Sequence, residues 1–204
     1  CHAGIMITAS HNPKEYNGYK VYWQDGGQLV PPHDVNVIRE VNKITTVNQV
    51  KWQKNPTLIE SIGVEIDKAY LDKVLKLRMN SDAINKAKNL KIVYTPLHGT
   101  GITLVPKALE MFGFHNIIVV DEQATPDGDF PTVKSPNPEE KSALQIALRK
   151  ADLEHADLLL ATDPDADRVG IAVRNSNGEM QLLNGNQTGT LLFYYMLSQY
   201  QLHN

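Results

Sequence analysis

Short apolar segments and helical segments alternate along the second half of this 204-residue chain, starting at Lys91. The apolar runs have the length of buried strands and cover residues 92–94, 117–120, 158–161 and 169–173, with helical spacing at 104–112 and a helix-opening pattern at 137–140. Strands that alternate with helices predict an α/β domain whose sheet is covered on its faces. We therefore expect mixed, largely parallel sheets flanked by helices, with one complete α/β domain over residues 91–183.

The first 45 residues predict only part of a second domain. Residues 4–8 and 18–23 have the composition of strands, and residues 34–44 have apolar side chains at helical spacing, with Asp34 placed to cap that helix. Two strands and one helix are too few to bury a core, so we expect residues 1–45 to be the C-terminal part of a larger domain and the chain to be truncated.

The remaining segments are a connector between domains and the first residues of a further domain. Residues 46–90 show no sustained period except for an amphipathic helix at 67–79, and they predict a link between domains. Residues 184–204 start a further helix and predict the start of a third domain.

Charge and composition exclude several classes of partner. A formal net charge of −3 gives no basic patch, so we expect no nucleic acid as a partner. The longest apolar run, residues 191–197, is far shorter than the ~20 residues of a membrane helix, so we expect no membrane. The chain has one cysteine, Cys1, which suits a cytoplasmic location.

Two polar loops follow apolar strands, where ligands bind in sheets of this kind. The first, residues 8–13, reads TASHNP and places Ser10 and His11 on a turn. Taken alone, it is more simply interpreted as a turn in which Ser10 and Asn12 satisfy backbone groups.

The second loop, residues 163–168, reads DPDADR and carries three carboxylates at alternate positions. A solvated acidic turn is the simpler alternative, but like charges directly after a buried strand repel one another unless a cation is bound. We favour one divalent cation on Asp163, Asp165 and Asp167, because such ions take oxygen ligands. His98, on another strand-end loop, either approaches a substrate or is a turn histidine bonded to the backbone.

Together, the motifs TASHNP at 8–13, NGYK at 17–20 and DxDxDR at 163–168 resemble the α-D-phosphohexomutase superfamily, which includes phosphoglucomutases and phosphomannomutases. The sequence of residues 4–23 is similar to that of the long-chain branch of the superfamily. Residues 185–187 resemble the start of the family's third domain. The resemblance covers essentially the whole chain. It implies that the start of the first of four domains, and nearly all of the third and fourth, lie outside these residues.

The resemblance also implies roles for individual residues. Ser10 would be the phosphoserine, and it would share one Mg²⁺ with Asp163, Asp165 and Asp167. Lys20 would act as general acid and base, while His11 and Arg168 would assist near the phosphate. The implied reaction interconverts sugar 1-phosphate and 6-phosphate, of glucose or mannose, through a sugar bisphosphate that also serves as activator.

Several alternatives remain open at this point. A phosphopentomutase of the same family, a metal-dependent phosphatase centred on Asp163, and a non-catalytic module that binds magnesium or a phosphosugar fit the same loops. Because the family's sugar-recognition and phosphate-binding loops are absent from these residues, we expect the 204 residues alone to be inactive. The family's common motif is DGDGDR, and in this sequence Pro164 and Ala166 stand in place of its two glycines. We expect Ala166 to exclude backbone angles that only glycine takes easily.

Overall fold

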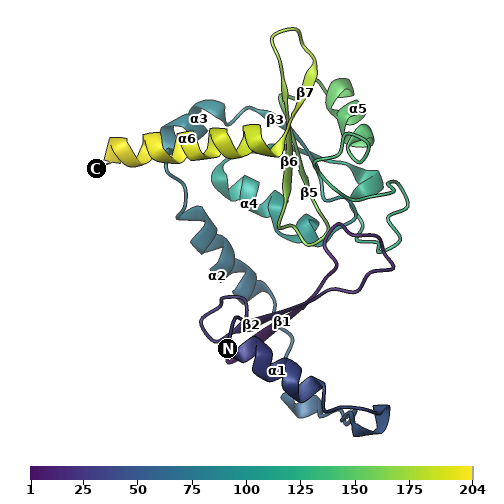
Figure 1. The fold of residues 1–204 in the computed structure, drawn as a ribbon. Coiled ribbons are helices and arrows are strands. Elements are labelled where there is room, and N and C mark those ends of the chain that lie inside the picture. Colours follow the sequence, from purple (N-terminus) through teal and green to yellow (C-terminus); the bar gives the residue numbers. More distant parts are fainter. Residues whose placement is uncertain (204) are drawn as a thin grey trace. The chain divides into compact units, whose positions relative to one another are not determined.

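A computed structural model describes residues 1–203, and the chain divides into two compact units (Figure 1). The first unit comprises residues 1–9 and 17–63. The second comprises residues 10–16 and those from Val64 onward. Across the described residues, no helix combines the length and apolar content that crossing a bilayer requires.

The first unit contains a hairpin and one α-helix. Strands β1 (Ala3–Ile7) and β2 (Tyr19–Trp23) pair antiparallel, with Ile5 opposite Val21. Helix α1 (His33–Val41) and two 3₁₀ turns, η1 (Val47–Gln49) and η2 (Pro56–Leu58), follow. Every fully buried apolar side chain among the described residues lies outside this unit.

The expected cap of helix α1 is wrong in detail. Pro32 occupies the N-cap position, and Asp34 lies inside the first turn, where it accepts a hydrogen bond from Val35 N at 2.7 Å. An acidic side chain in the first turn still favours the helix, because it faces the positive end of the helix dipole.

The second unit is built on a five-stranded sheet with strand order β4-β3-β5-β6-β7. Strand β3 pairs parallel with β4 and β5, whereas β6 pairs antiparallel with β5 and β7. The mixed α/β sheet is as expected. Its strands are β3 (Lys91–Thr95), β4 (Asn116–Val119), β5 (Leu158–Thr162), β6 (Val169–Arg174) and β7 (Met180–Leu183).

Helices lie on both sides of this sheet (Figure 1). The helices of this unit are α2 (Val64–Leu75), α3 (Ser81–Ala87), α4 (Val105–Phe112), α5 (Gln145–Leu153) and α6 (Gly185–His203), with 3₁₀ turns η3 (Thr100–Thr103) and η4 (Asp121–Gln123), and α4 and α5 lie on opposite sides of the sheet. The core lies under α5, where a row of side chains crosses the sheet and packs on that helix. The row is formed by Ile118, Val93, Leu159, Ala172 and Leu182.

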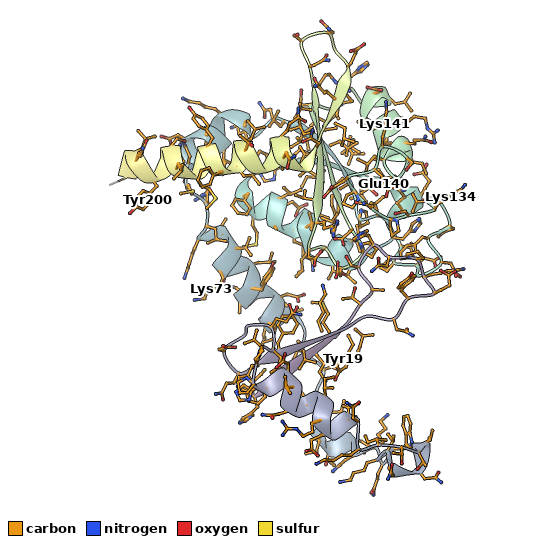
Figure 2. All side chains as sticks on the ribbon, in the orientation of Figure 1. Tyr19, Lys73, Lys134, Glu140, Lys141 and Tyr200 are labelled. Atoms are coloured by element: carbon orange, nitrogen blue, oxygen red, sulfur yellow. The ribbon has the colours of Figure 1, made fainter. Side chains whose placement is uncertain are left out.

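The expected helix start at residues 137–140 is wrong. These residues form a turn in which Asn137 Oδ1 accepts from Glu139 N at 3.1 Å, and α5 begins only at Gln145. Glu140 lies in the segment that leads into α5 (Figure 2) and accepts from the hydroxyls of Ser135 and Ser142. Asparagine closes turns and caps helices by the same side-chain acceptance, so the local pattern does not distinguish them.

Candidate functional site

The acidic loop, residues 163–168, is the turn of a tight hairpin between β5 and β6. The last pair of the ladder is Thr162 opposite Val169, so both ends of the loop are fixed by the sheet. Within the turn, Ala166 N donates to the carbonyl of Asp163 at 3.0 Å. The loop is therefore short and closed, and its alternate side chains point to a common region.

The three aspartates of this loop converge. One carboxylate oxygen from each of Asp163, Asp165 and Asp167 lies within 4.8 Å of the others. Asp163 is fully buried, whereas Asp165 is half-buried and Asp167 is exposed. The burial raises the pKa of Asp163 above its ordinary value, and the neighbouring Asp165 carboxylate adds to this rise. Hydrogen bonds from Ser10 and from Arg168 N act in the opposite direction.

This donor set fits a hard divalent cation. All three side chains offer carboxylate oxygens, which are the ligands that such ions prefer. Burial makes the charge on Asp163 unfavourable by itself, and a cation among the three groups would compensate that cost.

Ser10 is brought directly to the acidic loop. Its hydroxyl Oγ donates to Asp163 Oδ2 at 2.7 Å, across 153 positions of the sequence. The residue adopts φ 55°, in the left-handed region that few non-glycine residues occupy. Its Oγ also lies 3.1 Å from His11 Nδ1. A phosphoryl group on this oxygen would therefore lie beside the carboxylates.

The other two predicted site residues, Arg168 and Lys20, lie in different units of the chain. Arg168 ends the acidic loop, and its backbone N donates to Asp163 Oδ1 at 2.9 Å while the residue itself is exposed. Lys20 lies on β2 of the first unit, opposite Met6.

A second loop, residues 96–101, supports the acidic loop, and sequence reasoning missed this role. Both the backbone N and the hydroxyl of Thr100 donate to the Pro164 carbonyl, at 2.8 and 3.0 Å. A Cβ on Gly99 would lie 2.6 Å from the same carbonyl oxygen, so the two loops approach as closely as glycine permits. The doublet of glycines around Thr100 was the available signal.

The expectation for Ala166 is wrong. Ala166 has φ 60°, which lies in the left-handed region that was expected to be excluded. A non-glycine residue pays roughly 1–2 kcal/mol for this conformation, and the closed hairpin turn imposes it. Ala166 therefore occupies a conformation that glycine would adopt at a lower cost in free energy.

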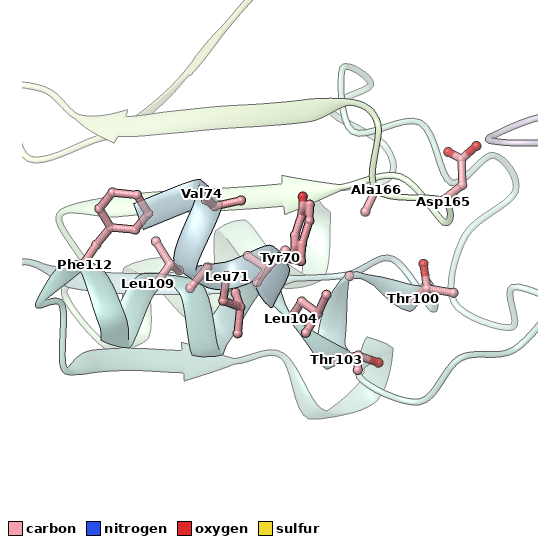
Figure 3. A pocket seen from close by; sticks show the side chains of 13 residues that line it. Tyr70, Leu71, Val74, Thr100, Thr103, Leu104, Leu109, Phe112, Asp165 and Ala166 are labelled. Atoms are coloured by element: carbon pink, nitrogen blue, oxygen red, sulfur yellow. The ribbon is translucent and has the colours of Figure 1, made fainter. Parts of the chain in front are cut away.

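An apolar cavity of about 650 Å³ lies next to the acidic loop, between α2 and α4 (Figure 3). Asp165, Ala166 and Thr100 stand at one end of it, and Leu71 and Phe112 are among the apolar side chains that line the rest. The acidic loop thus has an apolar surface beside it.

Comparison with known proteins gives the family. Residues 68–178 match the model of phosphoglucomutase/phosphomannomutase α/β/α domain II, and residues 1–48 match domain I. The chain is 41% identical to a probable phosphoribomutase of Schizosaccharomyces pombe, over 98% of this chain and 34% of that protein. It is 39% identical to a phosphoglucomutase of Staphylococcus haemolyticus, over 99% of this chain and 37% of that protein. It is 40% identical to a human glucose 1,6-bisphosphate synthase, over 95% of this chain and 32% of that protein.

The solved structures agree in fold. A putative phosphomannomutase from Thermus thermophilus matches with a TM-score of 0.62 at 24% identity, over 88% of this chain and 38% of that one. An N-acetylglucosamine-phosphate mutase matches with a TM-score of 0.55 at 16% identity, over 98% of this chain and 49% of that one. The chain spans about a third of the length of the curated relatives above. The family models together match most of its residues, and the chain belongs to the phosphoglucomutase/phosphomannomutase family.

Proposed function

We propose that the protein is a phosphosugar mutase that interconverts sugar 1-phosphate and 6-phosphate, of glucose or mannose, through phosphorylated Ser10. The observation that carries this proposal is the 2.7 Å contact between Ser10 Oγ and Asp163 Oδ2, which joins a hydroxyl to a cluster of carboxylates. A serine alone or an acidic loop alone fits many functions, whereas the pair fits phosphoryl transfer beside a cation.

The cation is proposed to be one Mg²⁺ held by Asp163, Asp165, Asp167 and an oxygen on Ser10. Three carboxylates leave coordination positions for phosphate oxygens, as magnesium sites commonly do. When bound, the ion would neutralise charge on the oxygens of the transferred group.

The chain's own groups account for the rest of the transfer. A sugar hydroxyl attacks the phosphorus while the bond from phosphorus to Ser10 Oγ breaks. Lys20 is proposed to take the proton that this hydroxyl loses, as general base, and to return a proton to Ser10 Oγ, as general acid. Asp163, 2.7 Å away, orients Oγ, and the guanidinium of Arg168 and His11 would add positive or donor groups nearby. Reversal of the step from the other phosphate of the sugar bisphosphate restores phosphoserine.

The same bisphosphate is proposed as the activator, because it loads Ser10 before the first turnover. We also propose that the sugar and its second phosphate are held by segments outside residues 1–204, as third and fourth domains of the same chain. The length of the curated relatives supports this, since the chain covers 34% of one and 37% of another. A cytoplasmic location is proposed from the low cysteine content.

A pentose substrate is the second candidate. It is favoured by the 41% identity to a probable phosphoribomutase, which slightly exceeds the 39% and 40% identity to two phosphoglucomutases. Assays of the native protein on glucose, mannose and ribose 1-phosphates, side by side, decide between the hexoses and the pentose.

Phosphopeptide mapping tests the central proposal. The native protein is incubated with a hexose 1,6-bisphosphate, and phosphate is expected on Ser10. Ser10→Ala should reduce mutase turnover by at least about 10³-fold, because the group that carries the phosphoryl is gone. The control is Ser61→Ala, which removes an exposed serine from the first unit and should keep full turnover.

Other outcomes identify the alternatives. If Ser10→Ala still hydrolyses sugar phosphates with unchanged rate, the protein is a phosphatase centred on the aspartates. If the native protein binds Mg²⁺ and phosphosugars without turnover, it is a binding module. Stable phosphate on another residue with Ser10 unmodified would contradict the mutase assignment.

A further inference from the structure

His98 lies in the loop that supports the acidic loop, and its side chain is turned into the protein. It is 5% exposed and adopts φ 61°, one residue before Gly99. Its Nδ1 lies 3.3 Å from the carbonyl oxygen of Thr125, and its Nε2 lies 2.8 Å from the hydroxyl of Thr132. Both ring nitrogens are therefore occupied by protein groups. Of the two interpretations left open by the sequence, the turn histidine is the one that the geometry supports.

The partners of His98 determine which nitrogen carries the proton. The Thr125 carbonyl can only accept a hydrogen bond, so Nδ1 must be the protonated nitrogen. In the neutral ring Nε2 then accepts, and the Thr132 hydroxyl donates to it. Thr132 Oγ1 in turn accepts from Gln123 Nε2 at 3.0 Å.

The chain of hydrogen bonds continues into the sheet. Gln123 Oε1 accepts from the hydroxyl of Thr95 at 2.7 Å, and Thr95 Oγ1 accepts from Leu97 N at 3.1 Å. Thr95 and Gln123 are both fully buried. Each group in the series has one role that fits all its neighbours, so the series is fully satisfied only when the His98 ring is present in this one tautomer.

The backbone of His98 makes the same connection a second time. His98 N donates to the carbonyl of Gln123 at 3.0 Å, and the carbonyl of His98 accepts from Asp127 N at 3.0 Å. The segment from Asp121 to Thr132 is thereby attached to the 96–101 loop by side chain and by main chain. A left-handed residue is costly for histidine, and these contacts hold it in place.

The next two residues carry the connection to the acidic loop. Gly99 approaches Pro164 too closely for any side chain, and Thr100 donates twice to the Pro164 carbonyl. Pro164 stands between Asp163 and Asp165, two of the three carboxylates. A displacement of Thr100 would therefore be passed to the backbone that sets the spacing of these carboxylates.

We infer that His98 is a positioning residue for the cation site: it locks the 96–101 loop, and that loop holds Pro164 and the carboxylates on either side of it. The inference rests on the proposed function, because it assigns a role toward the cation that Asp163, Asp165 and Asp167 are proposed to bind. It adds a residue that touches neither the carboxylates nor Ser10 in the contacts described above.

The test compares Mg²⁺ affinity of native-length variants by calorimetric titration, well below their melting temperatures. His98→Ala should weaken Mg²⁺ binding by about 10-fold, in the range seen when groups that orient a metal site are removed. Thr132→Val removes only the hydroxyl that donates to Nε2 and should weaken binding by a smaller factor. His98→Asn keeps a donor near the position of Nδ1 and tolerates the left-handed backbone, so it should restore part of the affinity.

The matched control is His155→Ala. His155 is also a histidine at positive φ, 52°, but it is exposed and follows α5. This control should leave Mg²⁺ affinity unchanged. The nitrogen chemical shifts of the ring in labelled protein give a readout without metal, and Nδ1 of His98 should be the protonated nitrogen, with Thr132→Val altering Nε2.

The failures of the two ideas are distinguishable. If wild-type protein does not bind Mg²⁺, or binds it equally well as Asp165→Ala, the cation site and the role of His98 are both wrong. If Asp165→Ala abolishes binding while His98→Ala and Thr132→Val retain wild-type affinity and lower only the melting temperature, His98 is merely structural. Should His98→Ala fail to fold, wild-type affinity in both Thr132→Val and His98→Asn overturns the inference.

Discussion

The acidic loop and the loop that carries Ser10 (residues 10–16, here called the serine loop) meet at the same site but are held in different ways. The acidic loop joins two paired strands of a sheet with a buried core, and it receives hydrogen bonds from Ser10 and Thr100. The serine loop belongs to the same unit, where Ser10 and an exposed ion pair of Lys14 contact it, but the strands that it joins, β1 and β2, lie in a unit without a fully buried apolar side chain. One loop is therefore held at both ends by a sheet with a buried core, and the other is not.

This difference suits the proposed reaction, in which a phosphoryl group is transferred to and from Ser10. A cation site benefits from fixed ligands, because each ligand that must be ordered costs conformational entropy. Ser10, the proposed carrier of the phosphoryl group, needs to reach the proposed cation and also to exchange that group with a sugar. The comparison makes four predictions, which differ in the size of the expected effect.

The largest expected effect is a coupling of the two loops through phosphorylation of Ser10. Phosphate adds about −1.5 to −2 charges and new oxygen ligands next to the aspartates. We expect Mg²⁺ affinity to rise by about 5- to 150-fold in the phosphorylated native protein, and the reverse coupling to be equal. Calorimetric titration of both forms measures it, with Asp165→Ala as the control that should bind weakly in either form. Equal Mg²⁺ affinity of the phosphorylated and unphosphorylated wild-type protein would show that the two loops are not coupled.

The second prediction concerns the buried hydrogen bond between Tyr94 and Thr162, the residue before the acidic loop, and its loss at alkaline pH. Burial raises the pKa of Tyr94 to about 12, and its hydroxyl lies 2.8 Å from Thr162 Oγ1. Because the pKa is higher in the folded protein than the ordinary 10.0, this stabilisation is complete below pH 10 and is lost between pH 10 and 12. The loss should reach about 2–3 kcal/mol.

Denaturant unfolding at pH 9 and pH 11.5 measures this loss. Tyr94→Phe should start less stable by about 1 kcal/mol, because a hydrogen bond is removed, and should then lose less stability as the pH rises. Tyr16→Phe, at an exposed tyrosine of the serine loop, should behave as wild type. An alkaline loss in Tyr94→Phe as steep as that of the wild type would contradict the assignment.

The third prediction uses the left-handed residue of the acidic loop. Ala166→Gly should relieve roughly 1–2 kcal/mol of backbone strain while adding about 0.4–1 kcal/mol of unfolded-state entropy. The net gain in the free energy of unfolding is then about 0–1.5 kcal/mol. Ala124→Gly, at an ordinary φ of −75°, is the control and should destabilise the protein. Equal destabilisation by both substitutions would mean that Ala166 is not strained.

The smallest expected effect is at the ion pair of the serine loop. Lys14 Nζ lies 2.8 Å from Asp129 Oδ1, and this contact raises the pKa of Lys14 and lowers that of Asp129. Both side chains are more than half exposed, so salt should screen the pair strongly.

Hydrogen exchange tests this pair. Lys14→Met should speed exchange of residues 10–16 slightly at low salt and not at ~1 M salt. Lys68→Met, which removes the exposed pair with Asp72, should leave these residues unchanged at any salt. A large effect of Lys14→Met that persists in high salt would show that the serine loop is anchored as firmly as the acidic loop.

Local pattern predicted the parts of this molecule whose shape depends on neighbours in sequence. The strands at β3, β5 and β6, and the alternate aspartates after β5, follow from apolar runs and spacing. The meeting of Ser10 with Asp163 could be expected only from the joint occurrence of two motifs, and the roles of Lys20 and Arg168 stay predictions.

What the pattern did not predict depends on contacts between distant segments. The helix expected at Asn137 is a turn, because asparagine and proline serve both. Ala166 takes a left-handed angle because the ladder at Thr162 and Val169 closes the turn around it. The contacts of His98 with Thr125 and Thr132 join loops about 30 residues apart, and no local spacing encodes them.

The hairpin turn between β5 and β6 also sets the order in which the site can assemble and come apart. All three carboxylates lie within five consecutive positions of a hairpin, a structure that closes in about 1–10 μs. The Ser10 contact must instead close a separation of 153 residues. Chain connectivity therefore allows the cation-binding half of the site to form before the contact with Ser10 is made.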